Sequence, residues 1–198
     1  MPDYAPPTRI RLISHPATAV LREGRVPADE ALDAQALREL EGVRWRSNGT
    51  NKILTSPEIR TMDTATALGL DATAIPELRE CDFGSWRGRS LEDVYIEDPK
   101  GCILWLSDLA AVPHGGGSFQ ELLTRVSGWL DSLSEAGPCI VVTHASIIRA
   151  ALIHALSAPE EAFWRIEVPP LSMTDLRLSG DKWHVRSFGT PLVQELAE

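Results

Sequence analysis

The chain has 198 residues, of which 43% are hydrophobic and 24% are charged, as in an ordinary globular protein. Its formal net charge of -9 at pH 7 argues against a general nucleic-acid-binding protein, because such proteins hold the phosphate backbone with clustered lysine and arginine. No apolar run approaches the roughly 20 residues that a membrane-spanning helix needs, so we expect neither a nucleic-acid nor a membrane partner.

Two short apolar runs, far apart in the chain, each end in a histidine. Ile10, Leu12 and Ile13 predict a buried first strand, and His15 follows it directly. Residues 139–142 predict a second buried strand that ends at His144 in the same way. Ligands of open α/β sheets bind at the carboxyl ends of the strands, so parallel strands would bring both imidazoles to one site. Histidines beside apolar runs are also often structural, and the pair alone decides nothing.

The chain after the first strand is predicted to form an exposed loop and then an amphipathic helix. The loop covers residues 21–30, which are charged and include glycine and proline. Asp33 is predicted to cap a helix that carries Leu37 and Leu40 on one face and ends near Val43.

A short strand over Lys52–Thr55 precedes a helix that bears a candidate anion-binding residue. Ser56 has a capping hydroxyl and Pro57 suits the first helical position, so a helix is predicted from there to Gly69. Arg60 then lies in the first turn, where backbone N–H groups and the helix dipole favour anions. An arginine on a helix surface is more often only solvated, so this residue is suggestive by itself.

The middle of the chain predicts loops around a mixed segment. Glycines flanking residues 85–87 indicate a tight loop. Residues 90–114 are interpreted as a possible lid or insertion over the site, and His114–Gly117 as a flexible connector. Ser118 and Glu121 then form a capping-box pattern that begins a helix.

That helix and the elements after it form the last third of the predicted fold. The helix is expected to end at Gly137, and a further helix from Ser146 to about Leu156 contains His154, which we interpret as structural. Two β-patterned runs joined by a Gly-Asp turn predict a C-terminal β-hairpin. The apolar face of the first helix consists of Phe119, Leu122, Leu123, Val126, Trp129, Leu130 and Leu133.

The cysteines and the amino-terminal residues indicate in which cellular compartment the protein is expected. Cys81, Cys102 and Cys139 are widely spaced and match no zinc-binding pattern, so we interpret them as reduced thiols of a cytoplasmic protein. Residues 1–7 lack the basic and apolar regions of a signal peptide. No internal repeat is present, and a single domain over residues 1–198 is the simplest organisation.

Taken in order, these segments resemble the histidine phosphatase superfamily, whose fold is also called phosphoglycerate mutase-like. The likeness spans nearly the whole chain. It is carried by five blocks, Ser14–Thr18, Ser56–Arg60, Leu78–Gly88, Gly115–Ser118 and Val141–His144. The resemblance implies an α/β fold, a three-layer α/β/α sandwich around a mostly parallel central sheet.

The resemblance also implies a phosphomonoesterase that acts on a small phosphorylated metabolite through a phosphohistidine intermediate. His15 would attack phosphorus through an unprotonated ring nitrogen while its other nitrogen donates to a backbone carbonyl. Arg60 and a protonated His144 would hold the phosphoryl oxygens, and Glu80 would be the general acid and then the base. No metal or organic cofactor is required. The substrate-binding residues expected from the resemblance are Ser14, Thr18, Arg22 and Ala145.

Two residues of the first block depart from the family pattern. Ser14 stands where the family has an arginine, and Pro16 replaces a glycine and removes a backbone N–H. Loss of a charged donor of this kind can cost ~3 kcal/mol of transition-state stabilisation, or ~100-fold in rate. Arg22, Arg25 and Arg87 are the candidates to compensate for it.

Two other functions stay open. A mutase of the phosphoglycerate type would need segments that enclose the substrate, and only residues 90–114 are available for this. A divergent member without efficient phosphatase chemistry would serve as a ligand-binding protein; Ser14 favours this alternative, whereas the presence of all four candidate catalytic residues argues against it. The expected partner is a small phosphorylated substrate, and a homodimer is a possible assembly.

Overall fold

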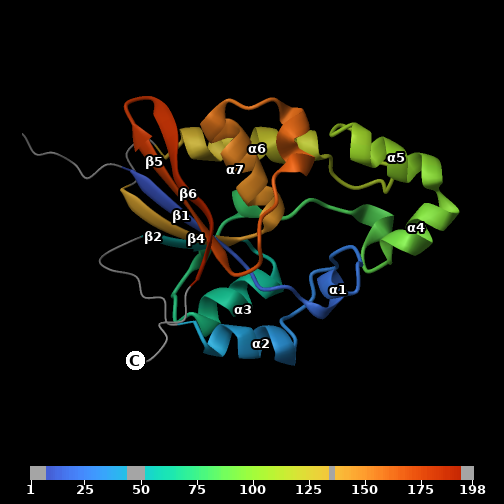
Figure 1. The fold of residues 1–198 in the computed structure, drawn as a ribbon, viewed down its shortest axis with the longest axis horizontal. Coiled ribbons are helices and arrows are strands. Elements are labelled where there is room, and N and C mark those ends of the chain that lie inside the picture. Colours follow the sequence, from blue (N-terminus) through green and yellow to red (C-terminus); the bar gives the residue numbers. More distant parts are fainter. Residues whose placement is uncertain (1–7, 44–51, 134–136, 193–198) are drawn as a thin grey trace, which may run out of the picture.

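The computed structural model describes residues 8–43, 52–133 and 137–192, which build a six-stranded sheet with the order β3-β2-β4-β1-β5-β6 (Figure 1). Its strands are β1 (Arg9–Ser14), β2 (Lys52–Thr55), β3 (Thr73–Ala74), β4 (Pro138–Thr143), β5 (Ser172–Ser179) and β6 (Lys182–Pro191). The first four in spatial order run parallel, and β5 and β6 form an antiparallel hairpin at the edge. The predicted mostly parallel sheet with a C-terminal hairpin is therefore confirmed.

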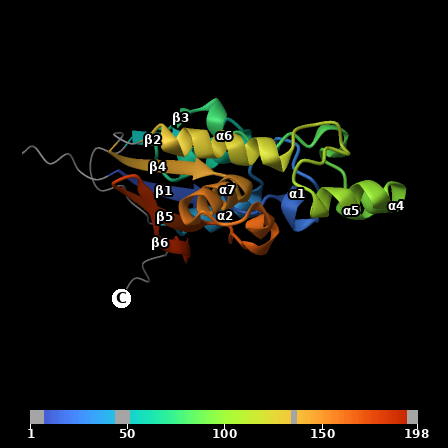
Figure 2. The same ribbon diagram turned by 90° about the horizontal axis from the view of Figure 1, so that it is seen from above.

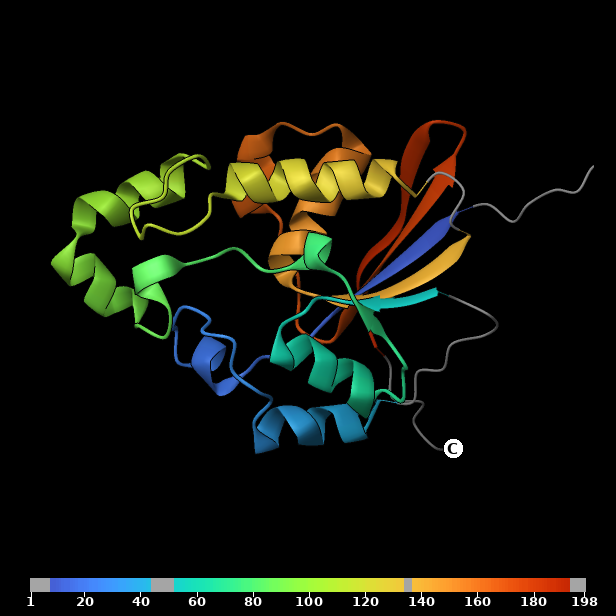
Figure 3. The same ribbon diagram turned by 180° about the vertical axis from the view of Figure 1, so that it is seen from behind.

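Helices cover both faces of this sheet. Figures 1 and 3 show α6 (Phe119–Asp131) and α7 (Ala145–Leu156) on one face, and α2 (Ala34–Glu41) and α3 (Ile59–Ala67) on the other. Side chains alternate between the two faces of a strand, so β1 and β4 feed two cores. The larger core takes Leu12 and Val141 and the smaller takes Ile13 and Val142, which makes the three-layer sandwich that was predicted.

The first helices differ in detail from the prediction. Residues 21–22 were expected in a loop but belong to α1 (Ala19–Arg22), which Thr18 caps by accepting a hydrogen bond from the Leu21 N–H. Asp33 caps α2 as predicted, with its side chain accepting from two backbone N–H groups. The buried residues of α2 are Ala36 and Leu40, four apart, whereas Leu37 is 43% exposed.

Three helix ends also move. Helix α3 begins at Ile59 because the Ser56 hydroxyl does not cap it; that hydroxyl donates to the Leu78 carbonyl instead. Helix α6 has the predicted capping box but ends at Asp131, before Gly137. Helix α7 begins one residue before the predicted start, at Ala145, and ends at Leu156 as predicted; Ser157, which caps it, has a positive φ of 48° ahead of Pro159.

Residues 90–114 form a helical hairpin of α4 (Leu91–Glu97) and α5 (Pro99–Ser107), which lies beyond the carboxyl ends of the parallel strands (Figure 2). Short 3₁₀ turns over Pro76–Leu78, Gly84–Trp86 and Glu160–Arg165 complete the described chain. Among the described residues, no helix has both the length and the apolar character needed to cross a membrane. The expectation about a signal peptide concerns residues 1–7, which lie outside the described ranges.

The connector over His114–Gly117 is a fixed turn and not a flexible one. The His114 ring is buried against Phe83 and Trp86, and its Nδ1 accepts a hydrogen bond from the Gly116 N–H. The His114 carbonyl accepts from the Ser85 N–H at 2.9 Å. Tertiary packing that the glycine-rich sequence does not reveal therefore orders this segment.

Replacement of Gly84 by alanine is expected to destabilise this turn strongly. Gly84 has a φ of +47°, and a Cβ added there would lie 2.1 Å from the His114 carbonyl oxygen. Backbone strain and the steric clash together should lower the free energy of unfolding by about 3 kcal/mol in urea titrations. Gly24→Ala is the matched control, since Gly24 has a φ of +66° with nothing within 4 Å, and should cost only about 1 kcal/mol. Equal losses in the two variants would contradict the close approach.

Candidate active site

Parallel pairing of β1 with β4 brings the two predicted histidines side by side. Ser14 lies opposite Thr143 in the register, and the His15 N–H donates to the Thr143 carbonyl at 3.1 Å. The imidazole ring centroids of His15 and His144 are 5.2 Å apart with an interplanar angle of 74°, and both residues are buried. Two residues separated by 129 positions in the sequence thus share one end of the sheet.

The His15 ring is held in a form that leaves Nε2 unprotonated. Its Nδ1 donates to the Pro16 carbonyl at 2.7 Å, and its Nε2 accepts from Arg60 Nε at 3.3 Å. Burial and the charges of His144 and Arg60 hold the pKa of His15 well below its ordinary value, and they outweigh the opposing bond to Pro16. A neutral imidazole whose Nε2 carries a lone pair and no proton is a competent nucleophile once Arg60 turns its hydrogen bond to the substrate.

Arg60 projects from the first turn of α3 and is 1% exposed. Its Nη2 lies 3.5 Å from Glu80 Oε2 and its Nη1 lies 3.9 Å from Glu30 Oε2. Within the described part of the chain, Arg60 Nη1 and His144 Nδ1 are both buried without a hydrogen-bond partner. A buried donor without an acceptor costs about 1–3 kcal/mol, so the guanidinium nitrogen Arg60 Nη1 marks a place where an anion would be stabilised.

Glu80 lies at the edge of this arrangement. Its Oε1 accepts hydrogen bonds from the Cys81 N–H at 2.9 Å and from the Ser146 hydroxyl, and its Oε2 lies 3.6 Å from His144 Nδ1. The side chain remains 13% exposed. A carboxylate that contacts both the buried site and solvent can pass a proton between the two.

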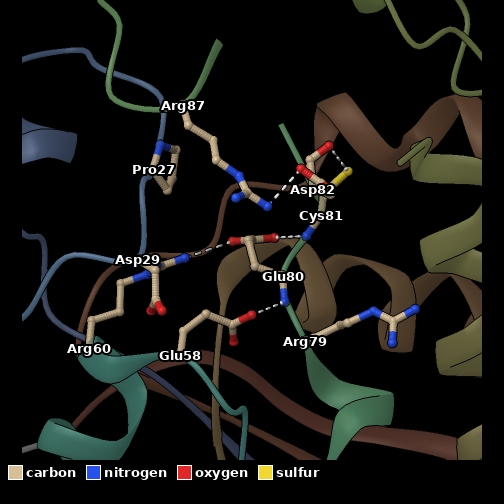
Figure 4. Close-up of a pocket in the computed structure, with 9 residues that line it drawn as sticks. All are labelled: Pro27, Asp29, Glu58, Arg60, Arg79, Glu80, Cys81, Asp82 and Arg87. Atoms are coloured by element: carbon tan, nitrogen blue, oxygen red, sulfur yellow. Dashed lines mark hydrogen bonds and ion pairs between the residues drawn. The ribbon is translucent and has the colours of Figure 1, made fainter. Parts of the chain in front are cut away.

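A cavity of about 270 Å³ opens beside these residues (Figure 4). Three residues of its wall contact the histidine pair: Arg60 contacts His15, and Glu58 and Glu80 contact His144. The full lining is Pro27, Asp29, Glu58, Arg60, Arg79, Glu80, Cys81, Asp82 and Arg87. Among the described residues, no group of three or more His, Cys, Asp or Glu side chains is arranged to hold a metal ion.

Sequence reasoning did not single out Glu58, the residue that directly precedes α3. Glu58 Oε2 lies 2.7 Å from His144 Nε2, and Oε1 accepts from the Glu80 N–H at 2.9 Å. Burial would raise the pKa of Glu58, but the hydrogen bond and the charge of His144 outweigh it and bring the pKa below its ordinary value. The one available signal was the position of Glu58 inside the Ser56–Arg60 block.

Three of the expected substrate-binding side chains are already bonded within the protein. The Ser14 hydroxyl donates to the Pro169 carbonyl at 2.7 Å and accepts from the Ser172 N–H at 3.0 Å. The buried Thr18 hydroxyl donates to Glu30 Oε1 at 2.7 Å. Arg22 donates to the Ala17 carbonyl and pairs with Asp33 at 2.7 Å. In this arrangement these side chains support the site's framework, and their contact with a substrate stays a prediction.

The other residues considered for substrate binding or for compensating Ser14 are Ala145, Arg25 and Arg87. Ala145 is the first residue of α7, so only its backbone, at a helix N-terminus beside His144, has a polar group to offer. Arg25 donates to the Gly88 carbonyl at 2.7 Å. Arg87 lies in the cavity wall but is paired with Asp82 at 2.8 Å. None of the three arginines proposed to compensate for Ser14 reaches the histidines in this arrangement, within the interactions of the described residues.

Comparison with known families identifies the arrangement. The profile of the histidine phosphatase superfamily (branch 1) matches residues 11–191. The bifunctional protein Rv2228c of Mycobacterium tuberculosis is 30% identical over 180 residues, covering 85% of this chain and 50% of the relative. The chain thus spans about half the length of such relatives. A glucosyl-3-phosphoglycerate phosphatase of Mycolicibacterium vanbaalenii is 29% identical over 155 residues, covering 70% of this chain and 66% of the relative.

Solved structures show the same fold. A putative alpha-ribazole-5'-P phosphatase from Escherichia coli superimposes with a TM-score of 0.83 at 24% identity, covering 93% of this chain and 98% of the other. YhfR of Bacillus stearothermophilus gives a TM-score of 0.83 at 21% identity, covering 92% of this chain and 97% of the other. The phosphoglycerate mutase-like fold predicted from the sequence is thereby confirmed.

Ser14→Ala is expected to change stability more than activity. Removal of the hydroxyl leaves the buried Pro169 carbonyl and Ser172 N–H each short of a partner, which should lower the free energy of unfolding by about 1–2 kcal/mol. Hydrolysis of p-nitrophenyl phosphate should stay within about twofold of the wild type. Ser146→Ala is the matched control, because this hydroxyl bonds Glu80 and its loss should lower kcat. A large loss of kcat/KM in Ser14→Ala would return Ser14 to the substrate site.

The lowered pKa of His15 should appear in the pH dependence of stability. The folded protein keeps this ring neutral, whereas the unfolded chain binds a proton near the ordinary value of 6.5. Stability is therefore lost as pH falls below 6.5, by up to about 1.4 kcal/mol for each pH unit. Urea unfolding at pH 7.5, 6.5 and 5.5 should show a shallower decline in His15→Ala than in the wild type. Parallel curves would mean that His15 is not held neutral by the fold.

Proposed function

The chain belongs to the histidine phosphatase superfamily, and on that premise we propose that it is a phosphomonoesterase that acts on a small phosphorylated metabolite through a phosphohistidine at His15. The observation that carries the proposal is the convergence of an unprotonated His15 Nε2 with two buried nitrogens, Arg60 Nη1 and His144 Nδ1, that have no hydrogen-bond partner among the described residues. A phosphoryl group supplies both an electrophile for the nitrogen and oxygens for the donors.

The proposed reaction has two displacements at phosphorus. In the first, His15 Nε2 forms a bond to phosphorus, the bond to the ester oxygen breaks, and Glu80 gives that oxygen its proton. In the second, Glu80 takes a proton from water, the water oxygen bonds to phosphorus, and the N–P bond breaks to return neutral His15. Arg60 and a protonated His144 stabilise the charge on the equatorial oxygens in both steps.

The charge balance of the site supports a modest rate. The Ser14 hydroxyl supplies no cation, and Arg60 has the carboxylates of Glu30 and Glu80 on its two terminal nitrogens. This specific observation favours a second candidate, a family member that binds a phosphorylated ligand and hydrolyses it slowly. No residue of 90–114 lines the cavity next to Glu80, so the helical hairpin gives no support to a mutase.

The location, substrate class and assembly of the protein are also proposals. All three cysteines are free and buried, which supports a cytoplasmic location, since thiols stay reduced there. The relative from Mycolicibacterium vanbaalenii is named as a glucosyl-3-phosphoglycerate phosphatase. For this chain we propose a small phosphorylated metabolite as the substrate class. Organisation of residues 1–198 as one domain and assembly as a homodimer are retained as predictions.

His15→Ala should abolish hydrolysis of p-nitrophenyl phosphate and the covalent intermediate with it. Acid-labile, alkali-stable ³²P should appear on the wild-type protein after a rapid quench with a labelled phosphomonoester, and it should be absent from His15→Ala. His154→Ala is the control, because that histidine bonds Asp131 on the outer helices. Undiminished turnover in His15→Ala would exclude His15 as the nucleophile, and ligand binding without turnover in the wild type would favour the second candidate.

A further inference from the structure

We propose that Glu58 is a positioning residue whose carboxylate holds His144 as an imidazolium with Nδ1 presented to the phosphoryl group. The inference rests on the proposed function, and it adds to it a carboxylate–histidine pair that controls the second histidine of the site. It is carried by the contacts of Glu58, by the unpartnered Nδ1 of His144 and by the presence of a serine, not a cation, at residue 14.

The two nitrogens of His144 have different surroundings. Nε2 is 2.7 Å from Glu58 Oε2, within the range of a charge-assisted hydrogen bond. Nδ1 is buried and has no hydrogen-bond partner among the described residues. An ionised carboxylate only accepts hydrogen bonds, so the proton of this contact belongs to Nε2. For Nδ1 to donate to a phosphoryl oxygen as well, the ring must carry both protons.

The groups that face His144 decide whether the ring keeps both protons. Glu58 approaches from the start of α3, and Glu80 lies 3.6 Å from Nδ1. Arg60 and the His15 ring lie on the other side of the site, where the charge of His144 acts on His15. Two carboxylates within 4 Å favour the imidazolium, whereas Arg60 opposes it. Glu58 makes the shorter contact of the two carboxylates and is the one that no arginine neutralises within 4 Å, among the described residues.

The same carboxylate also fixes the backbone that carries the general acid. Glu58 Oε1 accepts from the Glu80 N–H at 2.9 Å, as Figure 4 shows, while Oε2 holds His144. The position of Glu58 is in turn set by α3, which begins at the next residue and presents Arg60 from its first turn. One side chain therefore connects three of the four residues proposed for the chemistry.

The role proposed for Glu58 also explains how the site could hold a phosphoryl group with a serine at residue 14. With no cation at residue 14, the phosphoryl oxygens depend on Arg60 and on the charge of His144. A neutral His144 bonded to Glu58 through Nε2–H would present a lone pair at Nδ1, which repels an oxyanion. Keeping His144 protonated is thus worth more in this site than in one with a second arginine.

Glu58→Gln tests the inference because it preserves shape and removes the charge. Steady-state kinetics on p-nitrophenyl phosphate from pH 5 to 9 should show near wild-type kcat/KM at pH 5 to 5.5, where the ring is protonated in both proteins. At pH 8 the variant should lose about tenfold or more, and its alkaline limb should begin at least about one pH unit lower. Glu58→Asp, which retains the charge, should recover part of the loss at pH 8.

Asp131→Asn is the matched control. Asp131 Oδ1 pairs with His154 Nε2 at 2.8 Å, so the chain contains a second carboxylate–histidine pair of the same geometry outside the site. Its loss should leave the pH profile of kcat/KM where it is. A displaced alkaline limb in Asp131→Asn would show that any such pair shifts the profile, and it would overturn the specific role of Glu58.

Ring-nitrogen NMR separates this inference from the proposed function. In ¹⁵N-histidine-labelled protein, both His144 nitrogens should carry protons at pH 7, and the Nδ1 proton should be lost at lower pH in Glu58→Gln than in the wild type. This readout does not need turnover, so a wild-type protein without phosphatase activity would refute the proposed function and leave the pairing testable. Unchanged ring signals and an unchanged pH profile in Glu58→Gln would overturn the inference. Faster turnover of that variant at every pH would also overturn it, because Glu58 would then be competing with the phosphoryl group.

Discussion

The site depends on the parallel pairing of β1 and β4 in a single register. This pairing places the residues after Ser14 and Thr143 at the same level, so the nucleophile candidate and its neighbouring imidazole emerge together. The end of β2 is tied to the same place, since the Ser56 N–H donates to the Val142 carbonyl and the Ser56 hydroxyl lies 2.8 Å from Thr143 Oγ1. Arg60 follows Ser56 by four residues and therefore lies next to the histidines. A one-residue slip of either strand would send these side chains to opposite faces of the sheet.

At the end of the sheet that carries the site, Arg60 and His144 are in contact with three carboxylates. Arg60 lies between Glu30 and Glu80, and His144 lies between Glu58 and Glu80. Each carboxylate orders a cation, and each also reduces the positive potential that a phosphoryl group would meet. The arrangement favours precise placement of donors over strong attraction, which agrees with a serine at the position where the family has an arginine.

Local patterns were sufficient for the framework of the fold. Short apolar runs predicted β1 and β4, a short strand was predicted at β2, and two β-patterned runs predicted the C-terminal hairpin. The Ser118–Glu121 capping box predicted the start of α6, because this signal, like the others, lies within a few residues. The errors arose where a side chain is bonded to a distant segment. The Ser14 hydroxyl bonds residues 169 and 172, and the Ser56 hydroxyl bonds residue 78, and neither partner can be inferred from the neighbouring sequence. Glu58 belongs to the same class, since its partner His144 lies 86 positions away.

The scarcity of positive charge also bears on how a substrate arrives. Enzymes of anionic substrates often raise the encounter rate with a positive funnel, which can increase association 10-fold or more. This chain carries a formal charge of -9, and its cavity wall has four carboxylates, Asp29, Glu58, Glu80 and Asp82, and three arginines, Arg60, Arg79 and Arg87. If the proposed function holds, an anionic substrate would gain little long-range attraction from the chain as a whole, and dissolved salt screens such forces beyond about 8 Å at physiological ionic strength. Binding would then depend on short-range contacts inside the site, and the rate of binding on the concentration at which the cell supplies the substrate.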